Sequence, residues 1–250
     1  MSERRDHYSY TVYADPGTAR TFDERRFGGP IGDLVARGQA ETLARFLGPV
    51  EGRSILDVGT GTGRAALLLS AAGARVTGVD ASEEMLAIAR KRAVEQQADV
   101  RFEAGDAHAL GFPDRSFDVA VSLRVLMHTP RWQTCVGELC RVARDRVLID
   151  YPSARSTALL QSVGRRVRHA AGANTEPYRV FFDREIAAAL HRHGFQVRSV
   201  HRQFVLPIAL HKAIGSQAFT EALERVLRRL GLLHLFGSPV TVLAERCASS

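Results

Sequence analysis

Short apolar runs alternate with longer amphipathic segments along most of the chain. Runs rich in β-branched residues predict strands over residues 54–58, 75–79, 99–103, 117–122, 145–150, 195–205 and 238–246. Apolar residues at helical spacing predict helices over residues 31–47, 63–72, 82–96, 131–143, 183–193 and within 208–236. Because strand and helix alternate up to the fifth strand, the pattern predicts an α/β fold with a mainly parallel sheet and helices on both of its faces.

The alternation ends after the fifth predicted strand. Residues 153–180 hold an arginine-rich helical stretch and a loop, and residues 207–237 add further helix. The second of these segments carries one apolar stripe, which comprises Ala218, Phe219, Ala222, Leu223, Val226, Leu227 and Leu230. The run at 238–246 follows as a hairpin-like return, so we expect the last strand of the sheet to be antiparallel.

A chain of 250 residues is long enough for one sizeable domain that is stable without disulfide bonds. We expect a single domain over residues 1–250, with a core at 50–150. Aromatic residues among charges make residues 1–30 an N-terminal arm, and residues 153–180 and 207–237 are expected to form helical caps.

The composition, 45% hydrophobic and 24% charged, is ordinary for a soluble globular protein. The polar N-terminus lacks the apolar segment of a secretory signal, and no run approaches the roughly 18 apolar residues that span a bilayer. Three cysteines, Cys135, Cys140 and Cys247, are odd in number and lack the spacing of a zinc site. These features favour reduced thiols and a cytoplasmic protein, and no metal site is expected.

The net charge of +7 and the isoelectric point near 9.9 come largely from arginines scattered along the chain. Only R-R-V-R-H at 165–169 is locally dense. Two interpretations of this cluster remain open: a solvated basic face, or a contact with an anionic acceptor or a peripheral membrane surface. No appendage for binding nucleic acid is recognised, so no nucleic-acid partner is expected.

The stretch I-L-D-V-G-T-G-T-G-R at 55–64 ends a predicted strand with three alternating glycines. Gly59, Gly61 and Gly63 allow a sharp turn from strand to helix and let a ligand approach the backbone. The sequence from Gly61 also satisfies G-x-G-x-x-A, and Asp80 lies near the distance expected of a ribose-binding acid. A nicotinamide-dependent oxidoreductase is therefore admissible on these residues.

Three further features distinguish this turn. Asp57 precedes the glycines, Gly105-Asp106-Ala107 follows the third strand, and the fourth strand leads into Leu123-Arg124-Val125-Leu126-Met127-His128. In this set of motifs the sequence resembles the class I S-adenosylmethionine-dependent methyltransferases, particularly the enzymes of ubiquinone and menaquinone biosynthesis.

The resemblance spans about residues 50–150. It implies a Rossmann-like, seven-stranded, mostly parallel sheet, S-adenosyl-L-methionine as cofactor, and methyl transfer to a small-molecule acceptor. An NAD(P)-dependent oxidoreductase and a catalytically silent protein that binds the same cofactor remain the alternatives. The chain departs from the family pattern at 141–150, where the usual glycine turn is missing.

The resemblance also implies a role for each strand end. Asp80 is placed to hold the ribose diol, although it could instead cap the following helix. Asp106 and the Ala107 amide match the adenine edge, and the cofactor's ammonium group is expected near Asp57, Gly59 and the Ser122–Leu123 backbone. The residues expected at the cofactor are Asp57, Gly59, Thr60, Gly61, Gly63, Asp80, Ala81, Met85, Asp106, Ala107, Ser122 and Leu123.

His128 follows the fourth strand and is the best candidate for a catalytic base. Its imidazole can accept a proton near neutral pH, and the alternative is a histidine that only shapes the acceptor pocket. The motif of amino-methylating enzymes, D/N-P-P-Y/F, is absent at 122–125, which favours O- or C-methylation of a small molecule. Aromatic residues that could face the acceptor are Tyr10, Tyr13, Phe27, Tyr151 and Tyr178, unless they belong to the core.

Overall fold

The computed structural model describes residues 23–24, 26–159, 162 and 178–248, and within them seven strands form one sheet. The strands are β1 (Ser54–Val58), β2 (Arg75–Asp80), β3 (Val100–Ala104), β4 (Phe117–Ser122), β5 (Ala143–Tyr151), β6 (Phe195–Phe204) and β7 (Ser238–Arg246). Their order in the sheet is β3-β2-β1-β4-β5-β7-β6, and β7 runs antiparallel to both of its neighbours. The predicted fold class and the antiparallel last strand are therefore confirmed.

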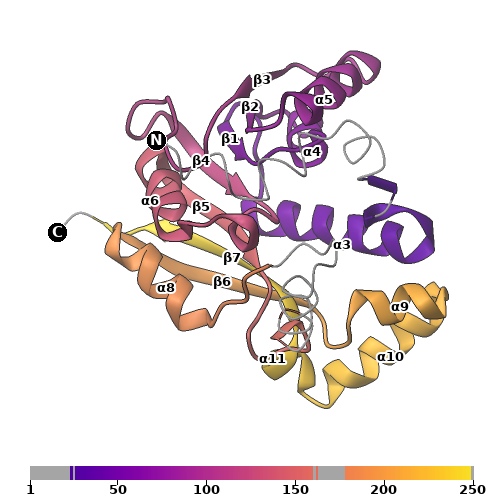
Figure 1. Cartoon of the computed structure of the whole chain (residues 1–250). Helices are drawn as coiled ribbons and strands as arrows, with labels where there is room; N and C mark the ends of the chain where they lie inside the picture. Colours follow the sequence, from indigo (N-terminus) through magenta and orange to yellow (C-terminus); the bar gives the residue numbers. More distant parts are fainter. Residues whose placement is uncertain (1–22, 25, 160–161, 163–177, 249–250) are drawn as a thin grey trace, which may run out of the picture.

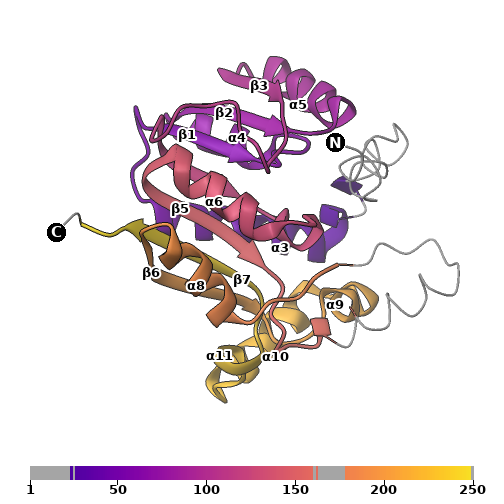
Figure 2. The same ribbon diagram turned by 60° about the vertical axis from the view of Figure 1, so that its left-hand side comes forward.

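Helices cover both faces of the sheet (Figure 1). They are α3 (Gly29–Leu47), α4 (Arg64–Ala71), α5 (Glu83–Glu95), α6 (Trp132–Val142) and α8 (Asp183–Arg192), with a short 3-10 helix η1 (Leu126–His128) after β4. The predicted segment 208–236 forms three helices, which are α9 (Ile208–Ile214), α10 (Gln217–Arg229) and α11 (Leu232–Phe236). Figures 1 and 2 both show α9, α10 and α11 at the opposite end of the molecule from α5.

The sheet separates two apolar layers because successive side chains of a strand point to opposite faces. On β1, Leu56 and Val58 pack with the buried residues of α6 and α8, whereas Ile55 packs with those of α3 and α4. The same alternation runs through β4, where Ala120 joins the first layer and Val119 the second. Both faces of the central strands are thus buried, which explains why their sequences are nearly continuously apolar.

The strand order reverses between β1 and β4, which are adjacent and parallel. β2 and β3 lie on one side of β1, and β5, β7 and β6 lie beyond β4. In a parallel sheet of this kind the carboxyl ends of the strands on either side of the reversal leave a crevice for a ligand. The topology therefore predicts a ligand site at the loops that follow β1, β2 and β4.

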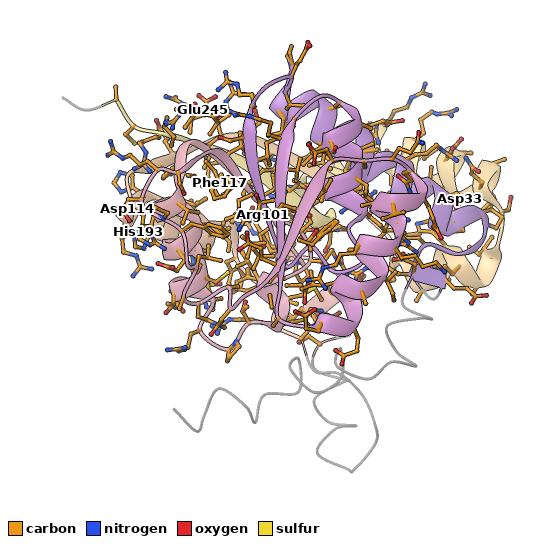
Figure 3. The ribbon with its side chains drawn as sticks, turned by 90° about the horizontal axis from the view of Figure 1, so that it is seen from above. Asp33, Arg101, Asp114, Phe117, His193 and Glu245 are labelled. Atoms are coloured by element: carbon orange, nitrogen blue, oxygen red, sulfur yellow. The ribbon has the colours of Figure 1, made fainter. Side chains whose placement is uncertain are left out.

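Charged side chains cover the outside of these layers. Figure 3 shows the exposed Asp114 and His193 on one side of the molecule and the exposed Asp33 on the opposite side. Within the described ranges, no cluster of three or more histidine, cysteine, aspartate or glutamate residues could hold a metal ion. None of the helices there is long and apolar enough to cross a bilayer.

Candidate active site

A cavity of about 180 Å³ lies at the carboxyl ends of β1, β2 and β4. Ten of the thirteen residues that the sequence predicted for the site line it: Asp57, Gly59, Thr60, Gly61, Asp80, Ala81, Met85, Ala107, Leu123 and His128. The other three, Gly63, Asp106 and Ser122, are not in its wall. The fold therefore brings most of the predicted residues together from four separate loops.

The glycine turn after β1 leaves backbone open to the cavity at one position. Gly61 has φ of 56°, and a Cβ built there would meet no atom within 4 Å. A Cβ on Gly59 would instead collide with Val125, and one on Gly63 would lie 3.0 Å from Ala89 and from the Phe102 ring. Gly59 and Gly63 thus permit close packing within the protein, while Gly61 keeps space for a ligand.

Asp80 ties the glycine turn to the end of β2. One carboxylate oxygen accepts a hydrogen bond from the Gly61 amide (2.8 Å) and the other accepts one from the Ser82 amide (2.9 Å). The helix-capping role belongs to Ser82, whose hydroxyl oxygen accepts from the Met85 amide at the start of α5. Burial raises the pKa of Asp80 above its usual value, and the amide bonds oppose that shift.

Asp57 lies beneath the same turn and is 2% exposed. Its carboxylate accepts a 2.7 Å hydrogen bond from the Thr60 hydroxyl. Burial raises the pKa of Asp57 to about 6, and the neighbouring charge of Asp80 adds to the shift. Two carboxylates with raised pKa values therefore border one cavity, an arrangement that a positively charged ligand would stabilise.

At the end of β3 the wall is formed by Gly105, Ala107 and His108. Asp106, which the sequence predicted as a direct contact with the cofactor, is not in this wall and pairs with His108. Its Oδ1 accepts from the His108 amide (2.8 Å) and lies 2.7 Å from the imidazole Nδ1. His108 was not predicted from the sequence, because the motif at this strand end comprises only Gly105, Asp106 and Ala107.

Ser122 and Leu123 have different roles at the end of β4. The Ser122 side chain is fully buried, and its hydroxyl donates a 2.9 Å hydrogen bond to the Val58 carbonyl. This hydrogen bond joins β4 to β1, and Ser122 does not line the cavity, whereas Leu123 does. Leu123 thus lies where the predicted backbone contact with the cofactor could form, and the Ser122 side chain bridges β4 and β1.

Arg124 is a wall residue that the sequence motifs did not single out. Its backbone has φ of 65°, in the left-handed region that non-glycine residues seldom adopt. The Arg124 amide donates to the carboxylate of Asp150, a residue only 5% exposed whose pKa is raised by burial. The Nε of Arg124 is buried and has no hydrogen-bond partner among the described residues.

His128 ends the helix η1 and lines the same cavity. Its amide donates to the Val125 carbonyl (2.8 Å), so the short helix fixes the backbone that carries the imidazole. Thr129 follows in the wall. The candidate base and the glycine turn therefore border one space, although 67 positions separate Gly61 from His128 in the sequence.

Residues preceding α3 complete the wall on another side. Arg26, Phe27 and, from α3, Gln39 line the cavity. The guanidinium of Arg64 lies 3.9 Å from the centre of the Phe27 ring, a cation–π contact that joins this segment to α4. Arg26 and Gln39 are distant in sequence from the motifs, and Arg64 ends the glycine motif without having been predicted at the site.

The predicted aromatic residues separate into three groups. Phe27 lines the cavity, as expected. Tyr151 and Tyr178 do not: both are buried in the core, where the Tyr151 hydroxyl donates to Asp183 (2.9 Å) and the Tyr178 hydroxyl to the Ala158 carbonyl (3.3 Å). Tyr10, Tyr13 and the basic cluster 165–169 lie outside the described residues.

Residues 56–149 match the protein-family profile described as a methyltransferase domain. Over 125 residues the chain is 39% identical to demethylmenaquinone methyltransferase from Thermus thermophilus, a match that covers 48% of this chain and 56% of that protein. It is 30% identical over 191 residues to the protein of the same name from Tropheryma whipplei, covering 68% and 77%. The first match thus spans little more than half the length of the relative.

A solved structure shares the fold over nearly the whole chain. It is magnesium protoporphyrin IX methyltransferase from Synechocystis PCC 6803 with bound SAH, which covers 96% of this chain and 98% of its own. The TM-score is 0.65 and the sequence identity is 17%. At that identity the likeness concerns the fold.

Proposed function

The chain belongs to the class I S-adenosylmethionine-dependent methyltransferases, and from this premise we propose that it methylates a small-molecule acceptor on oxygen or carbon. The observation that carries the proposal is that the glycine turn, Asp80 and His128 all border one cavity. We propose further that residues 1–250 form one domain, in which residues 50–150 bind the cofactor and the remaining segments surround the acceptor.

When bound, S-adenosylmethionine supplies an electrophilic methyl group attached to a positively charged sulfonium. The residues present suit such a molecule in two respects. Asp57 and Asp80 keep negative charge beside the cavity while neutral hydroxyl and amide donors brace them. The backbone at Gly61 is open where a side chain would take up space. A pyrophosphate would meet these two carboxylates unfavourably, which argues against a dinucleotide.

Asp80 has the capacity to hold a ribose diol as well as the glycine turn. An ionised carboxylate offers about four acceptor positions, and the Gly61 and Ser82 amides use two of them. We assign Ala81, Met85 and the Ala107 amide to the adenine side, since all three line the cavity next to Asp80. Asp106 then acts by positioning His108 through its two contacts with that residue.

The acceptor side is assigned to the loop after β4. Leu123, Arg124 and His128 line the cavity there, and Arg26 contributes from the segment before α3. The buried Nε of Arg124 would gain a partner from an acceptor oxygen, and its guanidinium would favour an anionic one. We therefore infer an acceptor that carries a phenolic, enolic or carboxylic oxygen.

His128 is assigned the role of accepting a proton from that acceptor. General-base catalysis contributes about 10²–10⁴-fold when an acceptor must be deprotonated. Leu123 and the glycine turn border the same cavity and would hold the cofactor and the acceptor there, and alignment of two reactants contributes about 7–11 kcal/mol at its extreme. The larger contribution of the protein is thus to orient the cofactor and the acceptor, and proton transfer to the His128 imidazole adds to it.

Ligand binding and methyl transfer test the proposal in sequence. Calorimetry and thermal unfolding should show binding of S-adenosylmethionine and S-adenosylhomocysteine but not of NAD or NADP. At ~100 times the dissociation constant, a ligand raises the free energy of unfolding by about 2.7 kcal/mol. Transfer of labelled methyl should then be screened on quinols, phenols and small acids, since relatives are named for demethylmenaquinone. Stabilisation by NAD alone would contradict the proposal.

A further inference from the structure

Helices α9 and α10 bury polar side chains. His211 and Thr220 are fully buried and Glu224 is 6% exposed. The Glu224 carboxylate lies 2.9 Å from the His211 Nε2 and also accepts from the amides of Val205 (2.8 Å) and Leu206 (3.0 Å). This cluster fixes which side of α10 faces the protein.

Many apolar side chains of α9, α10 and α11 are exposed. Seven of the twelve large hydrophobic residues that are exposed in the described part of the chain belong to this segment. They are Leu210 (44% exposed), Ile214 (41%), Phe219 (51%), Val226 (52%), Leu230 (67%), Leu235 (48%) and Phe236 (44%). We call these seven residues the α9–α11 apolar face. Exposed apolar residues that are concentrated in one segment mark an interaction surface, whereas single exposed apolar residues scattered over a protein are ordinary.

Basic side chains flank the apolar face. Arg225, Arg228 and Arg229 are all exposed on α10, and Arg229, three positions after Val226, is its neighbour on the helix surface. Of the two acidic residues of α10, only Glu221 is exposed, whereas Glu224 is buried. The helix therefore joins an apolar side to a cationic side, the arrangement of helices that lie in the headgroup region of a bilayer.

We propose that the α9–α11 apolar face binds the surface of an anionic lipid bilayer. Phe, Leu, Ile and Val side chains would enter the boundary between headgroups and acyl chains, while the α10 arginines contact anionic headgroups. A second copy of the chain fits less well, because pairing these faces would bring the arginines of two copies together in a protein whose net charge is +7. The inference does not rest on the proposed catalytic function.

The surface adjoins the cavity wall. The Lys212 Nζ of α9 donates a 3.0 Å hydrogen bond to the carbonyl of Arg26, a residue that lines the cavity. In Figures 1 and 2, α9 and α10 lie at the end of the molecule beyond α3 and away from α4 and α5. Docking through this end would leave the helices around the glycine turn in water.

Vesicle co-sedimentation with the full chain tests the proposal. Vesicles of equimolar phosphatidylglycerol and phosphatidylcholine should bind the protein, and binding should weaken as salt rises. Pure phosphatidylcholine vesicles should bind less, because the arginine contacts are lost. Failure of the wild-type chain to bind the anionic vesicles would overturn the proposal.

Matched variants separate the apolar and charged contributions. Phe219→Gln with Leu230→Gln should lower the partition coefficient by about tenfold or more. Val94→Gln with Val200→Gln, at residues 79% and 51% exposed elsewhere, should leave it unchanged. Arg225→Gln with Arg229→Gln should lower it about thirtyfold at low salt, roughly fivefold for each arginine. Arg75→Gln with Lys91→Gln makes the same charge change on β2 and α5 and should have a much smaller effect.

A fluorescent reporter locates the contact. The sole tryptophan, Trp132, is buried in α6 and provides a constant background. Phe219→Trp should shift its emission to the blue when anionic vesicles are added, whereas Val94→Trp should not. Equal losses in the test and control variants would overturn the proposal. A second result would also overturn it: the wild type does not bind vesicles but forms a dimer in sedimentation, and the Phe219 and Leu230 variant does not form that dimer. The apolar face would then bind a second copy of the chain.

Discussion

The parallel core and the α9–α11 segment arrange apolar and polar residues in opposite ways. In β1 and β4 the apolar side chains fill both layers, and polar groups gather at the strand ends around the cavity. In α10 the buried positions are Thr220 and Glu224, and Phe219, Val226 and Leu230 are exposed. A hydrophobic pattern thus shows which residues share a face, but a peripheral helix can turn that face outward.

At the core, the largest expected effect is that of His128→Asn. Turnover should fall by about 10²–10⁴ if the imidazole accepts a proton from the acceptor, and cofactor affinity and thermal stability should not change. Wild-type turnover should rise with pH as the imidazole becomes neutral, and the variant should lose that dependence. The exposed His193 supplies the control, His193→Asn. Unchanged turnover and pH profile would mean that alignment alone suffices.

In the α9–α11 segment, Glu224→Ala should have the next largest effect. It leaves the buried His211 and the Val205 and Leu206 amides without their acceptor. Loss of such a buried pair costs about 3–5 kcal/mol of unfolding free energy, which urea denaturation measures. Glu221→Ala, on the exposed side of α10, should stay within about 0.5 kcal/mol. Similar losses for both would show that the polar interior does not orient the helix.

The raised pKa of Asp57 predicts a pH-dependent loss of stability. Below about pH 3 the carboxyl is protonated in both states. As pH rises from 3 to 6 the unfolded chain loses its proton first, because the folded pKa is about 6 rather than 3.8. The wild type should therefore lose about 3 kcal/mol relative to Asp57→Asn between pH 3 and pH 7. Parallel stability curves for the two proteins would contradict the burial argument.

Asp80→Asn should weaken cofactor binding by about 10–100-fold, which is about 1.4–2.7 kcal/mol and typical of a hydrogen-bonded charge. Asparagine retains one acceptor oxygen, so the contacts with Gly61 and Ser82 are only partly lost and the fold should persist. Asp99→Asn, at an exposed position before β3, is the matched control for calorimetry. Unaltered affinity in a folded Asp80 variant would limit Asp80 to bracing the turn.

Gly61→Ala and Gly215→Ala give the smallest effects and compare the two regions directly. Both glycines have positive φ, 56° and 72°, and a Cβ at either position meets no close neighbour. Each alanine should cost about 1–2 kcal/mol of stability through backbone strain. Only Gly61→Ala should also lower cofactor affinity in calorimetry, because only that Cβ borders the cavity. Equal affinity in both variants would mean that the turn does not touch the ligand.

Much of the site could be predicted because it is encoded at the ends of strands. Gly61, Asp80, Ala107 and His128 each follow a short apolar run, and parallel strands bring such ends to one edge of a sheet. Arg26, Gln39, Arg64 and Arg124 were not predicted in this way. Arg26 and Gln39 reach the cavity through the packing of α3 and the segment before it, which have no local sequence signature. Arg64 and Arg124 lie within the motifs, but only the fold shows that they line the cavity.

The distinction between Asp80 and its neighbours also needed tertiary structure. The sequence allowed Asp80 either to hold a ligand or to cap α5; in the fold Ser82 caps α5, and Asp80 accepts a hydrogen bond from the Gly61 amide. Likewise, Asp106 and Ser122 stand at the predicted strand ends, but one pairs with His108 and the other with Val58. Orientation at a strand end depends on contacts across the fold.

The amino-acid sequence by itself determined the alternation of strands and helices, the antiparallel last strand and the loops that carry the site, because periodicity and turn residues act locally. Tertiary structure alone decided which side of α10 faces solvent. A buried cluster of His211, Thr220 and Glu224 forms its hydrogen bonds there and leaves Phe219, Val226 and Leu230 of the apolar stripe exposed. Helical spacing shows only that the residues of the stripe lie on one side of the helix. Which side is buried depends on contacts with residues that are distant in the chain.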